Sequence, residues 1–89
     1  MHKLHKVLKQ IHKEFEAAED YLHCASVAEN DDVEDLYKTL CKEELTHAEK
    51  LMNMCEKHLE QDMRPIWEFE KEMLKHKHLF LKTEWSHLD

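Results

Sequence analysis

The sequence predicts an all-α protein in which a long antiparallel helical hairpin is followed by a third helix. The 89 residues include no glycine and a single proline, so the chain carries very little turn chemistry. Apolar residues recur at alternating steps of three and four along most of its length, which is the spacing of a helix face. Helix-poor residues cluster only around 30–32 and 61–65. We therefore expect one helical domain spanning residues 1–89, with its hairpin at 3–60.

The first helix is expected at about residues 3–28. Its apolar seam contains seven residues without a gap, which is the pattern of a helix packed against nearly parallel or antiparallel neighbours: Leu4, Leu8, Ile11, Phe15, Ala18, Leu22 and Ala25. A second line, Val7, Glu14, Tyr21 and Ala28, repeats every seven residues along the flank of this seam. Glu14 is the acidic member of that otherwise apolar or aromatic line.

The second helix is expected at about residues 32–60. Asp31 is followed three residues later by Glu34, which predicts a capping box at its start. The link between the first two helices is short, so they should run antiparallel as a hairpin.

The third helix is expected at about residues 65–86, because Pro65 ends the preceding helix yet is tolerated in the first turn of a new one. Two adjoining apolar lines give this helix one broad face that must be covered. We expect part of it to meet another subunit. The two lines are Trp67, Leu74, Leu81 and Leu88, and Ile66, Met73 and Phe80.

Composition limits the classes of partner. Thirteen basic against twenty acidic residues give a formal charge of −7, which disfavours nucleic acid or an anionic membrane and suits cations. Cys24, Cys41 and Cys55 lack C-x-x-C spacing, so no disulfide framework or cysteine zinc site is indicated. No signal peptide or membrane-length segment is visible, and we expect a cytoplasmic protein. A chain this short should also need a partner or a metal for stability.

Glu44 and His47 interrupt the apolar line that helical spacing traces through the second helix. That line is Val33, Leu36 or Tyr37, Leu40, Glu44, His47, Leu51 and Met54. A Glu and a His three residues apart share a helix face and can hold one metal ion together. A Glu–His hydrogen-bonded pair, or a helix turned so that both side chains face water, accounts for the same spacing.

Glu14 is the third candidate ligand. It lies about as far before the expected turn as Glu44 and His47 lie after it, so a hairpin brings all three to one level. Ferritin-like di-iron proteins need a Glu from each of two helices and a Glu-x-x-His from each of two others. One hairpin of this chain supplies half of that set, and two copies supply all of it. Carboxylates and one imidazole favour iron or manganese over structural zinc.

The stretches Glu14–Tyr21 and Glu43–Ala48, with the gap between them, resemble the half-ferritins known as encapsulated ferritins. The resemblance implies a ferritin-like four-helix bundle completed by dimerisation. It also implies a di-iron ferroxidase site between two subunits, with Glu14, Glu44 and His47 as ligands, that oxidises Fe(II). A rubrerythrin-like peroxidase or manganese protein would share these ligands. A non-catalytic ferritin-like scaffold or interaction protein is the rival from another class.

The same resemblance implies roles for three further residues. Tyr21 would hydrogen-bond a ligand or act as a redox neighbour, and Glu16 and Glu43 would help iron to enter. An aromatic residue on a helix flank is more often packing, and surface acids are ordinarily solvated. Members of the family reside inside an encapsulin-type shell protein, which implies a nanocompartment location. The C-terminal segment 82–89 does not match their docking peptide.

Overall fold

The computed structural model describes residues 3–88, and this part of the chain is helical throughout apart from short connections. Helix α1 spans Leu4–Ser26, α2 spans Asp31–His58, a 3₁₀ turn covers Gln61–Met63, and α3 spans Arg64–Ser86. The predicted helices differ from these by at most two residues at any end. Met1, His2 and Asp89 of the expected domain lie outside the described residues. The all-α prediction is confirmed.

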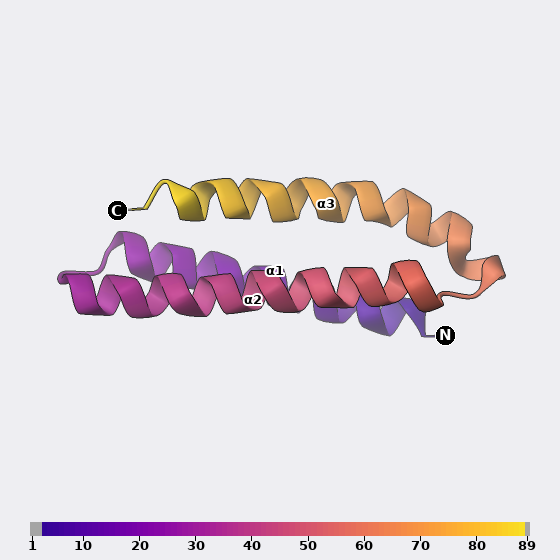
Figure 1. Cartoon of the computed structure of the whole chain (residues 1–89), viewed down its shortest axis with the longest axis horizontal. Helices are drawn as coiled ribbons and strands as arrows, with labels where there is room; N and C mark the ends of the chain where they lie inside the picture. The colour runs from indigo at the N-terminus through magenta and orange to yellow at the C-terminus, as the bar shows by residue number, and fades with distance from the viewer. Residues whose placement is uncertain (1–2, 89) are drawn as a thin grey trace.

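Helices α1 and α2 form the expected antiparallel hairpin (Figure 1). Its turn ends at Asn30, whose side-chain Oδ1 accepts a hydrogen bond of 2.9 Å from the backbone N–H of Val33. The prediction that Asp31 caps this helix was wrong, because Asn30 has the extended backbone that a capping residue needs and Asp31 is already helical.

The buried face of α1 is the predicted one. Leu4, Ile11, Phe15, Ala18 and Ala25 are buried, and the remaining two seam residues are half-buried. The first four of these buried residues belong to an apolar core that also includes buried residues of α2 and α3.

The buried face of α2 is not the line predicted for it. Small side chains occupy much of the real seam, so the larger apolar residues of the neighbouring line dominated the sequence pattern. That neighbouring line, which contains Leu40, Glu44, His47 and Leu51, is half-buried or exposed. The residues that enter the core are Cys41, Leu45, Ala48, Met52 and Cys55.

Helix α3 folds back along the hairpin (Figure 1). Pro65 lies in its first turn, as predicted. Trp67, Leu74 and Leu81 point into the core and are 1 to 2 % exposed. One of the two predicted apolar lines therefore covers the hairpin.

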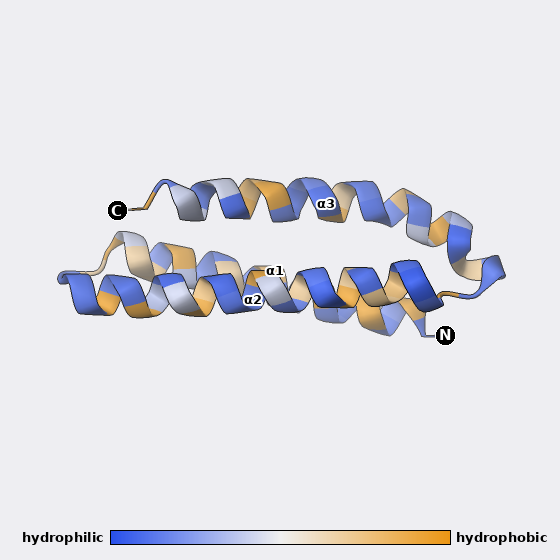
Figure 2. Cartoon of the chain, viewed as in Figure 1, coloured by the Kyte–Doolittle hydropathy of each residue, from blue (hydrophilic) through white to orange (hydrophobic). Residues whose placement is uncertain are grey.

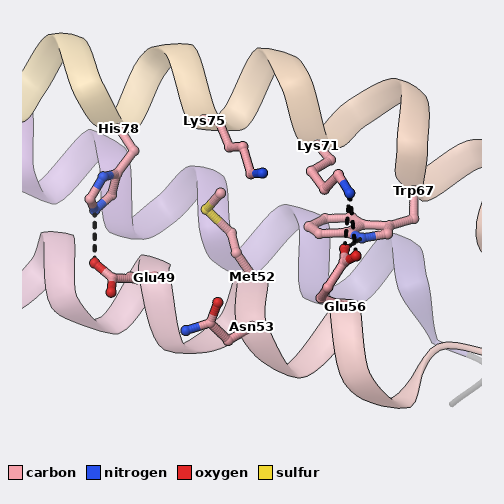
Figure 3. Close-up of a pocket in the computed structure, with 8 residues that line it drawn as sticks. All are labelled: Glu49, Met52, Asn53, Glu56, Trp67, Lys71, Lys75 and His78. Carbon is pink, nitrogen blue, oxygen red and sulfur yellow. Dashed lines mark hydrogen bonds and ion pairs between the residues drawn. The ribbon is translucent and has the colours of Figure 1, made fainter.

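Both ends of α3 are also tied to α2. Near its start, the Trp67 indole N–H donates to a Glu56 carboxylate oxygen at 2.6 Å, and Lys71 Nζ approaches the same carboxylate at 3.2 Å (Figure 3). Near its end, the Trp85 indole N–H donates to the Lys38 carbonyl at 2.8 Å. These bonds fix the register of α3 on the hairpin.

The second apolar line of α3 remains outside. Ile66, Met73 and Phe80 are 52 to 61 % exposed, and Phe69 beside them is 72 % exposed. Figure 2 shows hydrophobic residues recurring along α3, as they do along the other two helices. Within residues 3–88, no helix combines the length and apolar character needed to cross a bilayer.

Candidate metal centre

Three side chains that offer metal-ligating atoms converge where the middles of α1 and α2 meet. Glu14 comes from α1, and Glu44 and His47 come from α2, with one ligand atom from each lying within 4.8 Å of the other two. His47 Nδ1 is 3.5 Å from a Glu14 carboxylate oxygen and 3.9 Å from one of Glu44. The structure thus brings together the three residues that the sequence predicted as ligands, and the group can hold a metal ion.

The helices position this group on the side of the hairpin away from α3. Phe15 and Leu45 are buried, and both are touched by His78 of α3, through a ring contact and through the Leu45 carbonyl respectively. Glu14 directly precedes Phe15, and Glu44 directly precedes Leu45. Each glutamate is therefore turned about 100° around its helix from a residue that contacts α3. We call this side, with its ligand group, the open face of the hairpin.

The three side chains are graded in exposure. Glu14 is 13 % exposed and Glu44 is 22 %, whereas His47 is 53 % exposed and stands at the rim. No charged side chain of residues 3–88 is fully buried, so these carboxylates are among the chain's more shielded acids. Shielded carboxylates must be neutralised, paired or bound to a cation.

The two carboxyl groups share a proton. The hydrogen bond that the Glu44 carboxyl donates to Glu14, together with desolvation, raises the pKa of Glu44 to about 7. The same hydrogen bond lowers the pKa of Glu14, with help from Gln10 and His47. Below about pH 7, Glu44 is therefore the protonated member of the pair in the metal-free chain, and its carboxyl O–H donates to the Glu14 carboxylate. A cation that displaced this proton would take its place between two oxygen ligands.

Gln10 is a supporting residue that the sequence analysis missed. Its side-chain amide donates to a Glu14 oxygen at 2.7 Å from one turn earlier on α1. This bond orients the Glu14 carboxylate toward α2. The spacing of four residues was visible in the sequence, but such pairs on helix surfaces are common and carry little information by themselves.

The other predicted site residues lie outside the ligand group. Tyr21 is half-buried on the same flank of α1, and its ring lies 6.1 Å from that of Tyr37, which the sequence analysis did not pair with it. Glu16 and Glu43 are exposed. The negative charge of Glu43 nevertheless contributes to raising the pKa of Glu44.

Cys41 is not a member of the group either. It is fully buried one turn before Glu44, and desolvation raises its thiol pKa to about 11. A thiol that stays protonated is a poor ligand, because metals bind the thiolate. The donor set is therefore two carboxylates and one imidazole, which could hold a metal ion.

Comparison with protein-family models, curated proteins and solved structures finds no match to this chain. The observations therefore define its class by fold and site alone: an all-helical protein with a Glu–Glu–His group capable of binding a metal ion.

Proposed function

We propose that this chain binds iron through Glu14, Glu44 and His47, and that a second copy completes a di-iron site at which Fe(II) is oxidised. The observation that carries the proposal is the convergence of these three ligands on the open face of the hairpin. Three donors from one chain make an incomplete site. Two such sets give the four carboxylates and two imidazoles of a ferritin-like di-iron centre.

The open face supports a second copy as the source of the missing ligands. Half-buried apolar side chains flank the ligand group on both helices, so the face is suited to packing as well as to binding. A two-fold axis through the group would place the two hairpins together as a four-helix bundle. The flanking residues are Val7, Ala17 and Tyr21 on α1, and Leu40, Leu51 and Met54 on α2.

In this proposal iron is the substrate, and two Fe(II) ions reduce O₂ to hydrogen peroxide with uptake of two protons. The side chains supply binding and proton release. Glu44 would give up its proton when a cation binds, which would leave both carboxylates ionised and able to hold it. His47 contributes a ring nitrogen from the rim, and Gln10 holds Glu14 in place by its hydrogen bond.

Iron loading tests this function. Protein incubated anaerobically with Fe(II), freed of excess metal and analysed should contain about one iron per chain, which is one ligand group's share of a two-metal site. Glu44→Ala should lose most of that iron and most Fe(II) oxidation on admission of O₂. Asp20→Ala is the matched control, because it removes an exposed carboxylate from another face of α1.

The outcomes separate the proposal from its rivals. Stoichiometric iron lost in Glu44→Ala but kept in Asp20→Ala supports it. Stoichiometric Mn(II) without Fe(II) oxidation would indicate a manganese protein. A folded chain that retains no stoichiometric metal would reduce the group to a carboxyl pair with a neighbouring imidazole, as in a non-catalytic helical scaffold.

A further inference from the structure

The exposed side of α3 carries an apolar seam of its own. Its residues follow steps of three and four, which is the heptad spacing of helices that pair side by side. This outer seam is distinct from the buried line of Trp67, Leu74 and Leu81, which faces the hairpin. It consists of Ile66, Phe69, Met73, His76, Phe80 and Thr83.

The outer seam leaves much apolar surface in water. Four of its side chains are more than half exposed: Ile66 by 52 %, Phe69 by 72 %, Met73 by 61 % and Phe80 by 57 %. A single exposed apolar residue is common on protein surfaces. Four large ones in one line along a helix make a continuous patch, which marks an interaction surface. The line has the shape of a helix, so the partner that fits it is another helix.

The charges beside the outer seam select a second copy of α3 in antiparallel orientation. In the heptad register, Phe69 lies against Phe80 of the partner subunit, and Met73 lies against His76 of the partner subunit. Glu70 then lies beside Lys77 of the partner subunit. The two-fold axis generates the equivalent pair of Lys77 with Glu70 of the partner subunit. Lys77 already contacts Glu19 of its own chain at 2.7 Å, but it is 43 % exposed and accessible.

A parallel pair of α3 helices would be electrostatically worse. The first half of α3 carries three glutamates with Arg64 and Lys71, and the second half carries three lysines with Glu84. Counting Glu, Lys and Arg alone, the first half has a net charge of −1 and the second half a net charge of +2. Parallel packing sets like halves together and stacks His76 on its own copy. Antiparallel packing sets the acidic half of one helix against the basic half of the other.

We infer that two copies of this chain associate through an antiparallel contact of their α3 outer seams, centred between Met73 and His76. This contact lies on α3 and is separate from the open face, so it does not depend on metal. Each chain then has two different two-fold surfaces, and together these build assemblies larger than a dimer.

A charge introduced into the outer seam tests the contact. The mass of the assembly is measured by sedimentation, once with chelator and once with Fe(II). Phe69→Glu should weaken this association at least about tenfold, which lowers the mass toward that of a single chain with chelator and toward that of the open-face dimer with Fe(II). Its side chain lies mostly in water in the single chain, so the substitution should leave the fold intact. Thr46→Glu is the matched control, because it adds the same charge at an exposed position of α2.

A second set of variants tests the register. Glu70→Lys and Lys77→Glu should each weaken association, and the double variant Glu70→Lys/Lys77→Glu should restore it by exchanging the two charges. A general loss of helix stability would not be rescued in this way. Unchanged mass in Phe69→Glu, or failure of the double variant to recover, would overturn the inference. The proposed function would survive that result if iron content and Fe(II) oxidation remained at parental levels.

Discussion

The side of the hairpin that α3 covers and the open face are formed by the same two helices, but they differ in the residues at their centres. The side beneath α3 is closed by Trp67, Leu74 and Leu81, and its residues are apolar. The open face is also largely apolar, yet it has Glu14 and Glu44 near its centre, sharing a proton. A shielded carboxyl pair reduces stability unless something compensates it. The comparison shows that one side maintains the fold, whereas the other carries a group that could hold a metal ion.

The largest effect is expected on the covered side. Trp67→Ala removes a side chain that is 1 % exposed and leaves both a cavity and the Glu56 carboxylate without its indole donor. We expect a loss of about 3–5 kcal/mol in the free energy of unfolding, measured by denaturant titration. Leu51→Ala on the open face is the comparison, and its half-buried side chain should contribute about 1 kcal/mol. Equal losses would mean that the two sides do not differ as described.

Metal removal should act on the open face alone. Chelation should weaken the dimer, because it leaves four carboxyl groups of two chains facing one another, and added Fe(II) should restore it. Glu14→Ala should lose metal binding yet assemble better than the parent without metal, since it removes two of these groups. Sedimentation of both proteins with chelator and with metal measures this. Identical assembly in all four samples would place the ligand group away from the subunit contact.

The shared proton predicts the pH dependence of the metal-free chain. Glu44 has a folded pKa of about 7 against 4.5 as its ordinary value, so between these pH values the folded chain holds a proton that the unfolded chain has lost. Stability should therefore fall as pH rises from about 4.5 to 7, by about 1–2 kcal/mol. Glu44→Gln should flatten this slope in thermal unfolding at several pH values. A slope that persists in the variant would show that other groups cause it.

The smallest effects are expected at the two exposed acids near the group. Glu16→Ala and Glu43→Ala should leave bound iron at the parental amount and change the free energy of unfolding by no more than about 0.5 kcal/mol. Glu43→Ala should also lower the pKa of Glu44 slightly, because a neighbouring negative charge is removed. Slower Fe(II) oxidation at unchanged iron content would assign these residues to metal entry.

The helices and the meeting of the three ligands followed from the sequence because both depend on spacing. A seam without gaps defined α1, and similar distances from the turn placed Glu14 opposite Glu44 and His47. Helical rise and hairpin geometry are nearly independent of the particular side chains, so counting residues was sufficient.

The seam of α2 and the surroundings of the ligands could not be obtained in the same way. Cys41, Ala48 and Cys55 are small, and only tertiary packing shows that they are buried in place of the larger residues of the next line. The hydrogen bond from Gln10 and the Tyr21–Tyr37 contact depend on rotamers. The capping residue of α2 could not be predicted because Asn30 and Asp31 are adjacent, and Asn and Asp cap helices almost equally well.

Native mass spectrometry of the chain titrated with Fe(II) under anaerobic conditions tests the central claim most directly. The account predicts that iron binding and an increase in mass appear together, in species that carry two iron ions for every two chains. Glu44→Ala should show neither the ions nor the metal-dependent increase in mass. Iron bound with no change in assembly, or an iron-dependent increase in mass that persists in Glu44→Ala, would contradict the claim that the open face is a shared metal centre.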